Sequence, residues 1–205
     1  MHGRDASGAR HAALMQSGFS FTTSMRQFCA DAVLRLAVLG HIDLAHVALS
    51  FAQARKRTRH GMYASLTPMR FAGGSLTCRR QSRSYTIQRL YDAQGCEIFY
   101  ILTFYLPRFM DLPFREKLIT VFHELWHINP GFDGDLRRHE GRCYAHTYSQ
   151  KQYDAEMDAL ASQYLASAPP ASLYDFLQYD FTGLVAQYGR VYGTKVRRPR
   201  LLKLF

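Results

Sequence analysis

The stretch that most constrains the fold is His123-Glu124-Leu125-Trp126-His127, an H-E-x-x-H sequence in a segment expected to be helical. Pro113 suits the first helical position, and Asp111 can cap the helix. Apolar residues recur at three- and four-residue spacing from Leu118 to Trp126, which predicts one buried helix face. Asn129-Pro130-Gly131 then ends the helix, because proline disfavours helical backbone in the residue before it.

The helix places two histidines four residues apart on one face, so both imidazoles can bind one tetrahedral zinc ion. Glu124 is rotated roughly 100° around the axis from His123, where its carboxylate can reach a metal-bound water. With nine His and five Glu among 205 residues, chance would give roughly 0.01 copies of the pattern. A structural pair of buried histidines would account for both His but not for the Glu between them.

The motif in its helix resembles the zincin superfamily of zinc metallopeptidases. The resemblance implies that His123 and His127 bind Zn²⁺ and that Glu124 is the general base. Eleven residues separate His127 from His139, a spacing similar to that of the SprT-like and putative phage metallopeptidase groups, in which a loop delivers a third His. His139 is therefore the expected third ligand, with His146 and Glu156 as alternatives. The resemblance covers about residues 20–170.

The expected function is zinc-dependent peptide hydrolysis by Glu-assisted attack of a zinc-bound water. His146 and Tyr144 are candidate donors to the oxyanion that forms in the tetrahedral intermediate. Two alternatives remain open at this point. One is a nucleic-acid-binding protein with a structural zinc, and the other is a zinc amidohydrolase acting on a non-peptide substrate.

The order of elements predicts an α+β, zincin-like fold: a small mixed sheet on the motif helix, with further C-terminal helices. Helices are expected at 20–39, 150–166, 172–178 and 181–188, and strands at 47–54, 62–71, 84–91 and 97–104, the last two joined by a hairpin-like loop at 92–95. In such a fold an edge strand pairs with an extended substrate. We expect a disordered leader over 1–18, one domain over 19–190 and a basic tail over 191–205.

Charge is distributed unevenly along the chain, whose net charge is +10. Residues 44–91 hold nine basic and no acidic residues, and residues 181–205 hold six basic and none acidic, whereas 92–180 carry thirteen acidic against seven basic. Besides a protein or peptide substrate, nucleic acid is a possible partner through 55–89 and 190–203. A solvated basic face, or steering of an acidic protein substrate, would also explain the pattern.

The composition indicates a folded protein in a reducing compartment. The four cysteines are scattered without a C-x-x-C pair, which is typical of free thiols. The longest apolar runs are far shorter than a membrane span, and residues 1–20 lack the apolar core of a secretory signal. We therefore expect a cytoplasmic protein that makes no membrane contact.

Overall fold

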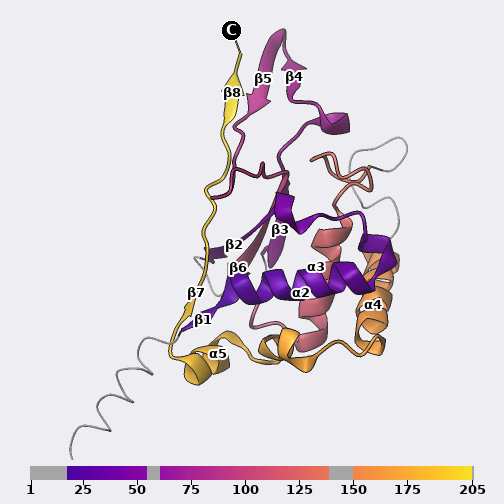
Figure 1. The fold of residues 1–205 in the computed structure, drawn as a ribbon, viewed down its shortest axis with the longest axis vertical. Helices are drawn as coiled ribbons and strands as arrows, with labels where there is room; N and C mark the ends of the chain where they lie inside the picture. Colours follow the sequence, from indigo (N-terminus) through magenta and orange to yellow (C-terminus); the bar gives the residue numbers. More distant parts are fainter. Residues whose placement is uncertain (1–17, 55–60, 139–149, 205) are drawn as a thin grey trace, which may run out of the picture.

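The computed structural model describes residues 18–54, 61–138 and 150–204, with the side chains of 150–154 left aside. Within these ranges the chain forms four α-helices and three small sheets, which confirms the predicted α+β class. Figure 1 shows a helical body around a central sheet, from which a second sheet projects at the top of the view. None of the helices in the described ranges combines the length and apolar content that crossing a bilayer requires.

The central sheet has the strand order β2-β6-β3. Its strands are β2 (Val47–Gln53), β6 (Tyr100–Leu106) and β3 (Ala64–Pro68). Strand β6 lies in the middle, parallel to β2 and antiparallel to β3. Its Tyr100, Leu102 and Phe104 are fully buried on one face, as expected for a strand in contact on both sides.

Two helices pack on that face of the sheet. They are α2 (Phe21–Arg35), followed by a 3₁₀ turn (Ala37–Leu39), and α3 (Phe114–Trp126). Phe21 and Phe28 of α2 and Phe122 of α3 belong to the same core as the inner face of β6. Because both helices contribute a continuous apolar stripe, α3 is held rigidly against the sheet.

The remaining helices close the body. They are α4 (Gln150–Ala166), two 3₁₀ turns (Ala171–Leu173 and Asp175–Gln178) and α5 (Phe181–Tyr188), close to the predicted ranges. Helix α4 packs on α3, and its buried Met157, Ala161 and Tyr164 extend the core. Fully buried Lys117 of α3 donates through Nζ to the carbonyls of Leu177 and Tyr179, which ties the 3₁₀ turn before α5 to α3.

After α5 the chain returns along the whole molecule (Figure 1). Strand β7 (Val191–Tyr192) pairs with β1 (Phe19–Ser20), and the Phe51 amide donates to the carbonyl of Thr194 at 3.1 Å. The segment therefore covers the outer edge of β2. It ends in β8 (Leu201–Lys203), which joins β4 (Thr77–Arg80) and β5 (Arg83–Ile87) in an outer sheet of order β4-β5-β8. Residues 191–203 of the basic tail therefore pack against other parts of the same chain.

The predicted hairpin between 84–91 and 97–104 is wrong beyond its turn. Asp92 accepts the amides of Gln94 and Cys96, and a single antiparallel bridge joins Tyr91 to Glu97. The two arms then separate into different sheets. The apolar 97–104 arm becomes the buried centre of one sheet, whereas the polar 84–91 arm pairs at the surface.

The predicted cap of α3 is also wrong. Pro113 is the N-cap and makes no side-chain cap hydrogen bond. Asp111 instead accepts the amide of Phe181 at 3.2 Å, at the start of α5. A carboxylate near one helix start can thus serve a different helix when tertiary packing brings it closer.

Candidate functional site

The two motif histidines converge at the C-terminal end of α3. His127 is the C-cap residue, and its amide donates to the carbonyl of His123 at 3.3 Å. The two Nε2 atoms lie 2.9 Å apart, with the rings at 79° to one another. Both side chains are half-buried. The predicted pair is therefore brought together on one helix face.

This geometry fits a zinc ion. Zinc–nitrogen bonds of about 2.0–2.1 Å in a tetrahedral arrangement separate two ligand nitrogens by about 3.3 Å. The observed Nε2 separation of 2.9 Å, which is also a hydrogen-bond distance between the two rings, is somewhat shorter than that value. Neutral imidazoles are also the donors that zinc most often uses together with carboxylates.

A tetrahedral zinc site needs at least one more protein ligand than these two histidines. Within the described ranges no group of three or more His, Cys, Asp or Glu side chains is placed to hold a metal ion. Glu156 is on α4 and exposed. His139, His146 and Tyr144 lie outside the described residues, so their predicted roles stay predictions.

The described chain nevertheless returns to α3 just before position 139. The Arg137 amide donates to the carbonyl of His127 at 2.8 Å, and its Nε donates to the carbonyl of Trp126. The Arg137 guanidinium lies 4.0 Å from the centre of the Trp126 ring. Ile128 and Leu136 form an antiparallel bridge beside them. Residues 136–138 therefore lie against the helix end that carries His127.

Asp135 holds this returning loop in place. Its buried carboxylate accepts two hydrogen bonds from Arg138, at 2.6 and 2.9 Å, and one from the Gly73 amide at 3.0 Å. Burial raises the pKa of Asp135, but the hydrogen bonds from Arg138 and the backbone amides outweigh it, so the pKa falls below its usual value. Asp135 is a possible metal ligand by type, yet the structure gives it an organising role.

The Glu124 carboxylate is buried beside the central sheet, with 9% of the residue exposed. Burial raises the pKa of Glu124 to about 7, while a hydrogen bond from the Leu66 amide of β3 acts in the opposite direction. A carboxyl group with a pKa near neutrality can both accept and return a proton. The motif glutamate therefore sits where proton transfer is chemically feasible.

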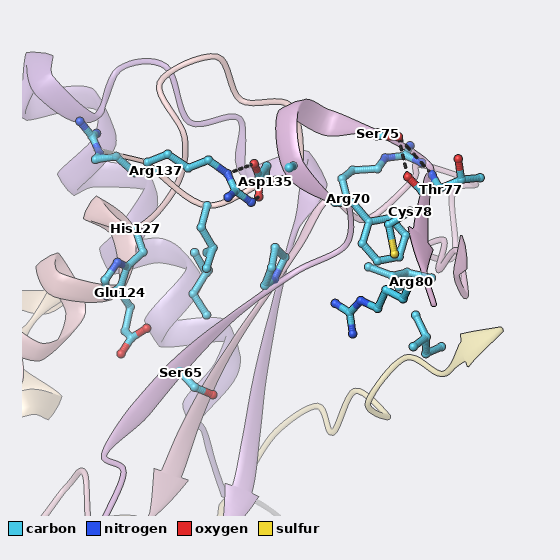
Figure 2. A pocket seen from close by; sticks show the side chains of 18 of the residues that line it. Ser65, Arg70, Ser75, Thr77, Cys78, Arg80, Glu124, His127, Asp135 and Arg137 are labelled. Atoms are coloured by element: carbon cyan, nitrogen blue, oxygen red, sulfur yellow. Dashed lines mark hydrogen bonds and ion pairs between the residues drawn. The ribbon is translucent and has the colours of Figure 1, made fainter. Parts of the chain in front are cut away.

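Glu124 and His127 face a cleft of about 880 Å³. Figure 2 shows these two side chains on one side of it and Cys78 and Arg80 of the outer sheet on the other. Ser65 of β3 lines the floor, and Asp135 lies at the end formed by the returning loop. A volume of this size is typical of ligand sites. The cleft thus runs from the motif helix across the edge of β3 to the outer sheet.

Strand β3 presents an unpaired backbone edge to this cleft. Among the strands of the described residues, none pairs with β3 on the side away from β6. Met69 donates to Phe99, and Tyr63 accepts from Tyr105, so the odd-numbered residues between them face β6. Ala64 and Leu66 then direct their backbone amides and carbonyls outward, in agreement with the contact from Leu66 to Glu124.

The sequence includes Arg80 only in the basic segment 55–89 and does not place it opposite Glu124. Pro68 is typical of an edge strand, and among the described strands β3 is indeed an edge. Arg80 and Leu66 carry no motif, because their positions depend on strand register and on pairing with the C-terminal segment. Only a knowledge of the sheet order identifies them.

Comparison with models of known protein families, with curated proteins and with solved structures gives no match for this chain. Support for a zincin-like site therefore comes from the motif residues and from their placement. The placement comprises the converging histidines, the buried Glu124 carboxylate and the open edge of β3.

Proposed function

We propose that this chain is a zinc-dependent metallopeptidase with a zincin-like arrangement of sheet and motif helix. The observation that carries the proposal is the joint position of three groups around one cleft. The Nε2 atoms of His123 and His127 lie 2.9 Å apart, the buried carboxylate of Glu124 lines the cleft together with His127, and β3 offers a backbone edge. An H-E-x-x-H motif without such an edge would not favour a peptide over another substrate.

His123 and His127 would hold the zinc ion, and His139 is the proposed third ligand. The last described residues before His139 lie against the end of α3, which supports this choice over Glu156 on α4. When bound there, zinc supplies Lewis acidity to a carbonyl oxygen and to water. The remaining chemistry falls to side chains and backbone of this chain.

The open edge of β3 would hold the substrate in an extended conformation. The outward amide and carbonyl of Ala64 and the outward carbonyl of Leu66 can pair with the main chain of a peptide, independently of its side chains. Because the Leu66 amide contacts the Glu124 carboxylate, a peptide on this edge brings its backbone to Glu124. Glu124 then takes a proton from the attacking water and passes it to the leaving amine.

The oxyanion donor is proposed among His146 and Tyr144, as the sequence predicts. A donor aimed at the developing oxyanion contributes roughly 100-fold or more to the rate. Substitution of each residue by Phe, measured as kcat with metal content unchanged, distinguishes a donor from a ligand.

The first test is metal content and turnover on a pool of unstructured peptides. We expect about one zinc per chain in the wild type, lost on His123→Ala or His139→Ala but kept in His146→Ala and Glu156→Ala. Zinc should raise the unfolding temperature of the wild type, because it binds the folded state. Glu124→Gln should keep zinc and lose turnover by at least about a thousandfold, which removal of the proton acceptor implies.

Two outcomes would contradict the proposal. A wild-type chain that binds no zinc when metal is supplied would remove the metal centre. A Glu124→Gln variant that cleaves as fast as the wild type would exclude the proposed proton transfer. Loss of zinc in His146→Ala, with His139→Ala unaffected, would instead move the third ligand and leave the function standing.

A further inference from the structure

The register of the outer sheet places a set of basic and apolar residues on one face. Arg80 is directly opposite Arg83, and Cys78 is opposite Tyr85, which is in turn opposite Lys203. Directly opposed residues, and alternate residues along a strand, share a face. We call this side the arginine face, and its members are Cys78, Arg80, Arg83, Tyr85, Ile87, Leu201 and Lys203.

The arginine face is the side turned to the cleft. Four of its residues line the cavity that Glu124 and His127 line from the other side: Cys78, Arg80, Ile87 and Leu201. Figure 2 shows the Arg80 side chain extending from β4 into that cavity. Arg79, one position earlier, belongs by the same register to the opposite face. The cleft thus has one wall with the motif glutamate and another with exposed cations.

The cations of the arginine face have no acidic partner in the described chain. The three strands contain no Asp or Glu. Among the described residues, the ion pairs involve other cations, and none involves Arg80, Arg83 or Lys203. By contrast, Arg70 and Arg138, which also line the cleft, are paired with Glu97 and Asp135. Within the part of the chain that the structure describes, the positive charge of this wall is therefore uncompensated.

The stability of the β4–β5 hairpin does not explain why Arg80 and Arg83 are arginines. Like charges directly opposite each other across two strands are destabilising, yet Arg80 and Arg83 occupy such a pair next to the turn. The turn residues Gln81 and Ser82 both have positive φ, 47° and 61°, where Asn and Gly are the favoured residues. Neither the turn nor the charges thus stabilise this hairpin, and an anionic ligand on the arginine face would relieve the repulsion.

We propose that the cleft selects polypeptide substrates with acidic side chains, recognised by Arg80, which lines the cleft, while Arg83 opposite it adds positive charge on the arginine face. This inference rests on the proposed peptidase function. A peptide paired with β3 has its side chains alternating across the cleft, where a carboxylate meets Arg80 in a charge-assisted hydrogen bond. Phosphates of a nucleic acid would also suit arginines, but a nucleic acid lacks the amides that pair with the β3 edge.

The test measures binding and cleavage separately. The probes are a fluorescein-labelled extended peptide with Asp at alternate positions and the same peptide with Asn there. Binding is followed by fluorescence anisotropy on zinc-loaded Glu124→Gln, and cleavage on the wild type. Each is repeated with Arg80→Gln and with Arg80→Gln/Arg83→Gln. Arg79→Gln is the matched control for Arg80→Gln, since each removes one charge from β4 and the two side chains lie on opposite faces.

We expect the Asp peptide to bind about tenfold tighter than the Asn peptide, in line with hydrogen bonds between charged groups. The advantage should fall with added salt and disappear in Arg80→Gln/Arg83→Gln but persist in Arg79→Gln. The selectivity of kcat/KM should change in the same way. Circular dichroism of each variant confirms that the fold is retained.

The possible failures are distinguishable. Equal cleavage and binding of both peptides would overturn acidic selectivity and leave the peptidase function intact. If the Asp peptide binds through Arg80 and Arg83 but the wild type cleaves neither peptide, the peptidase function fails while the binding face stands. If a labelled single-stranded oligonucleotide binds through these arginines and the Asp peptide does not, the face is a nucleic-acid surface and the proposal is overturned.

Discussion

The two three-stranded sheets of this chain differ in how deeply their side chains are buried. In the central sheet, Tyr100, Leu102 and Phe104 of β6 are fully buried under α2 and α3. In the outer sheet, Leu201 and Leu202 of β8 remain 49% and 39% exposed, and Arg79, Arg80 and Arg83 are exposed on β4 and β5. Burial fixes the geometry of the motif helix, whereas the outer sheet adds little core and leaves its side chains available to a ligand.

The largest expected effect separates the two sheets by stability. Phe104→Ala removes a buried ring that contacts Phe21 and Phe109 at centroid distances of 5.6 and 4.7 Å. Such a change should lower the free energy of unfolding by about 3–5 kcal/mol. Tyr85→Ala in β5, half-buried in the outer sheet, should cost about 1 kcal/mol or less. Denaturant titrations measure both values. If the two variants lost equal unfolding free energy, the two sheets would not differ in their contribution to stability.

A second test compares a buried lysine of the helical body with an exposed lysine of the outer sheet. Burial lowers the pKa of Lys117 from 10.5 to about 8, against the opposing effects of Asp180 and Asp111. Between these pH values the unfolded chain binds more protons at this site than the folded chain, so the site makes unfolding costlier as pH rises. Relative to Lys117→Met, the wild type should gain up to about 3 kcal/mol from pH 8 to 10.5.

The matched control for Lys117 is Lys203, an exposed lysine of the outer sheet. Lys203→Met makes the same chemical change at an exposed position and so controls for the loss of one positive charge. Other titrating groups, such as Cys29 with its raised pKa, are common to all three proteins and cancel in the comparison. If the difference in unfolding free energy between the wild type and Lys117→Met did not change with pH, the ammonium group of Lys117 would be better compensated in the core than its burial implies.

The comparison also shows what the sequence can predict. Apolar periodicity and the Asn129-Pro130-Gly131 stop located the motif helix closely, and β-branched and aromatic runs located β2 and β6. These patterns report local burial. They also place His123, Glu124 and His127 on one helix, which the convergence of the Nε2 atoms at 2.9 Å confirms.

The contacts that the sequence did not predict depend on pairing between distant parts of the chain. Ile87 pairs with Leu201, a contact between distant parts of the chain that no local pattern encodes. The opposition of Arg80 and Arg83, and the contact of Leu66 with Glu124, follow from register and sheet order. The same holds for Asp135, whose carboxylate accepts the amide of Gly73, 62 positions earlier in the chain.

Proline substitutions sharpen the assignment of the open edge of β3. Ser65 faces β6 by register, so Ser65→Pro removes a ladder hydrogen bond and should lower stability by about 1–3 kcal/mol. Leu66 faces the cleft, and an edge strand tolerates proline there. Leu66→Pro should therefore keep the ladder to β6 but weaken peptide binding by about tenfold or more, since its ring blocks the addition of a strand to this edge. Because it also removes the amide that donates to Glu124, binding and not turnover is the readout. Thermal unfolding and peptide anisotropy measure the two effects.

The opposite pattern would relocate the substrate. If Leu66→Pro unfolded the chain while Ser65→Pro left peptide binding and stability unchanged, the outward-facing positions of β3 would be misassigned. If both variants kept peptide binding, the β3 edge would have no part in recognition, and the cleft would hold its ligand through side chains alone.

The smallest expected effect on global stability is that of deleting residues 200–205. The deletion removes β8 but no residue of either buried core cluster. The free energy of unfolding should change by less than about 1 kcal/mol, as for surface changes away from the core. The remaining β4–β5 hairpin, however, should fray, because an isolated two-stranded hairpin is marginally stable.

Hydrogen exchange resolves this difference between local and global opening. The Gln88 amide donates to the carbonyl of Arg200 at 2.9 Å, so its protection should be lost in the deletion variant. The Tyr105 amide, which donates to Tyr63 in the central sheet, should keep its protection. If both amides lost protection together, the two sheets would unfold as one cooperative unit. The outer sheet would then be part of the folding core, and its arginines would have to be explained by stability instead of binding.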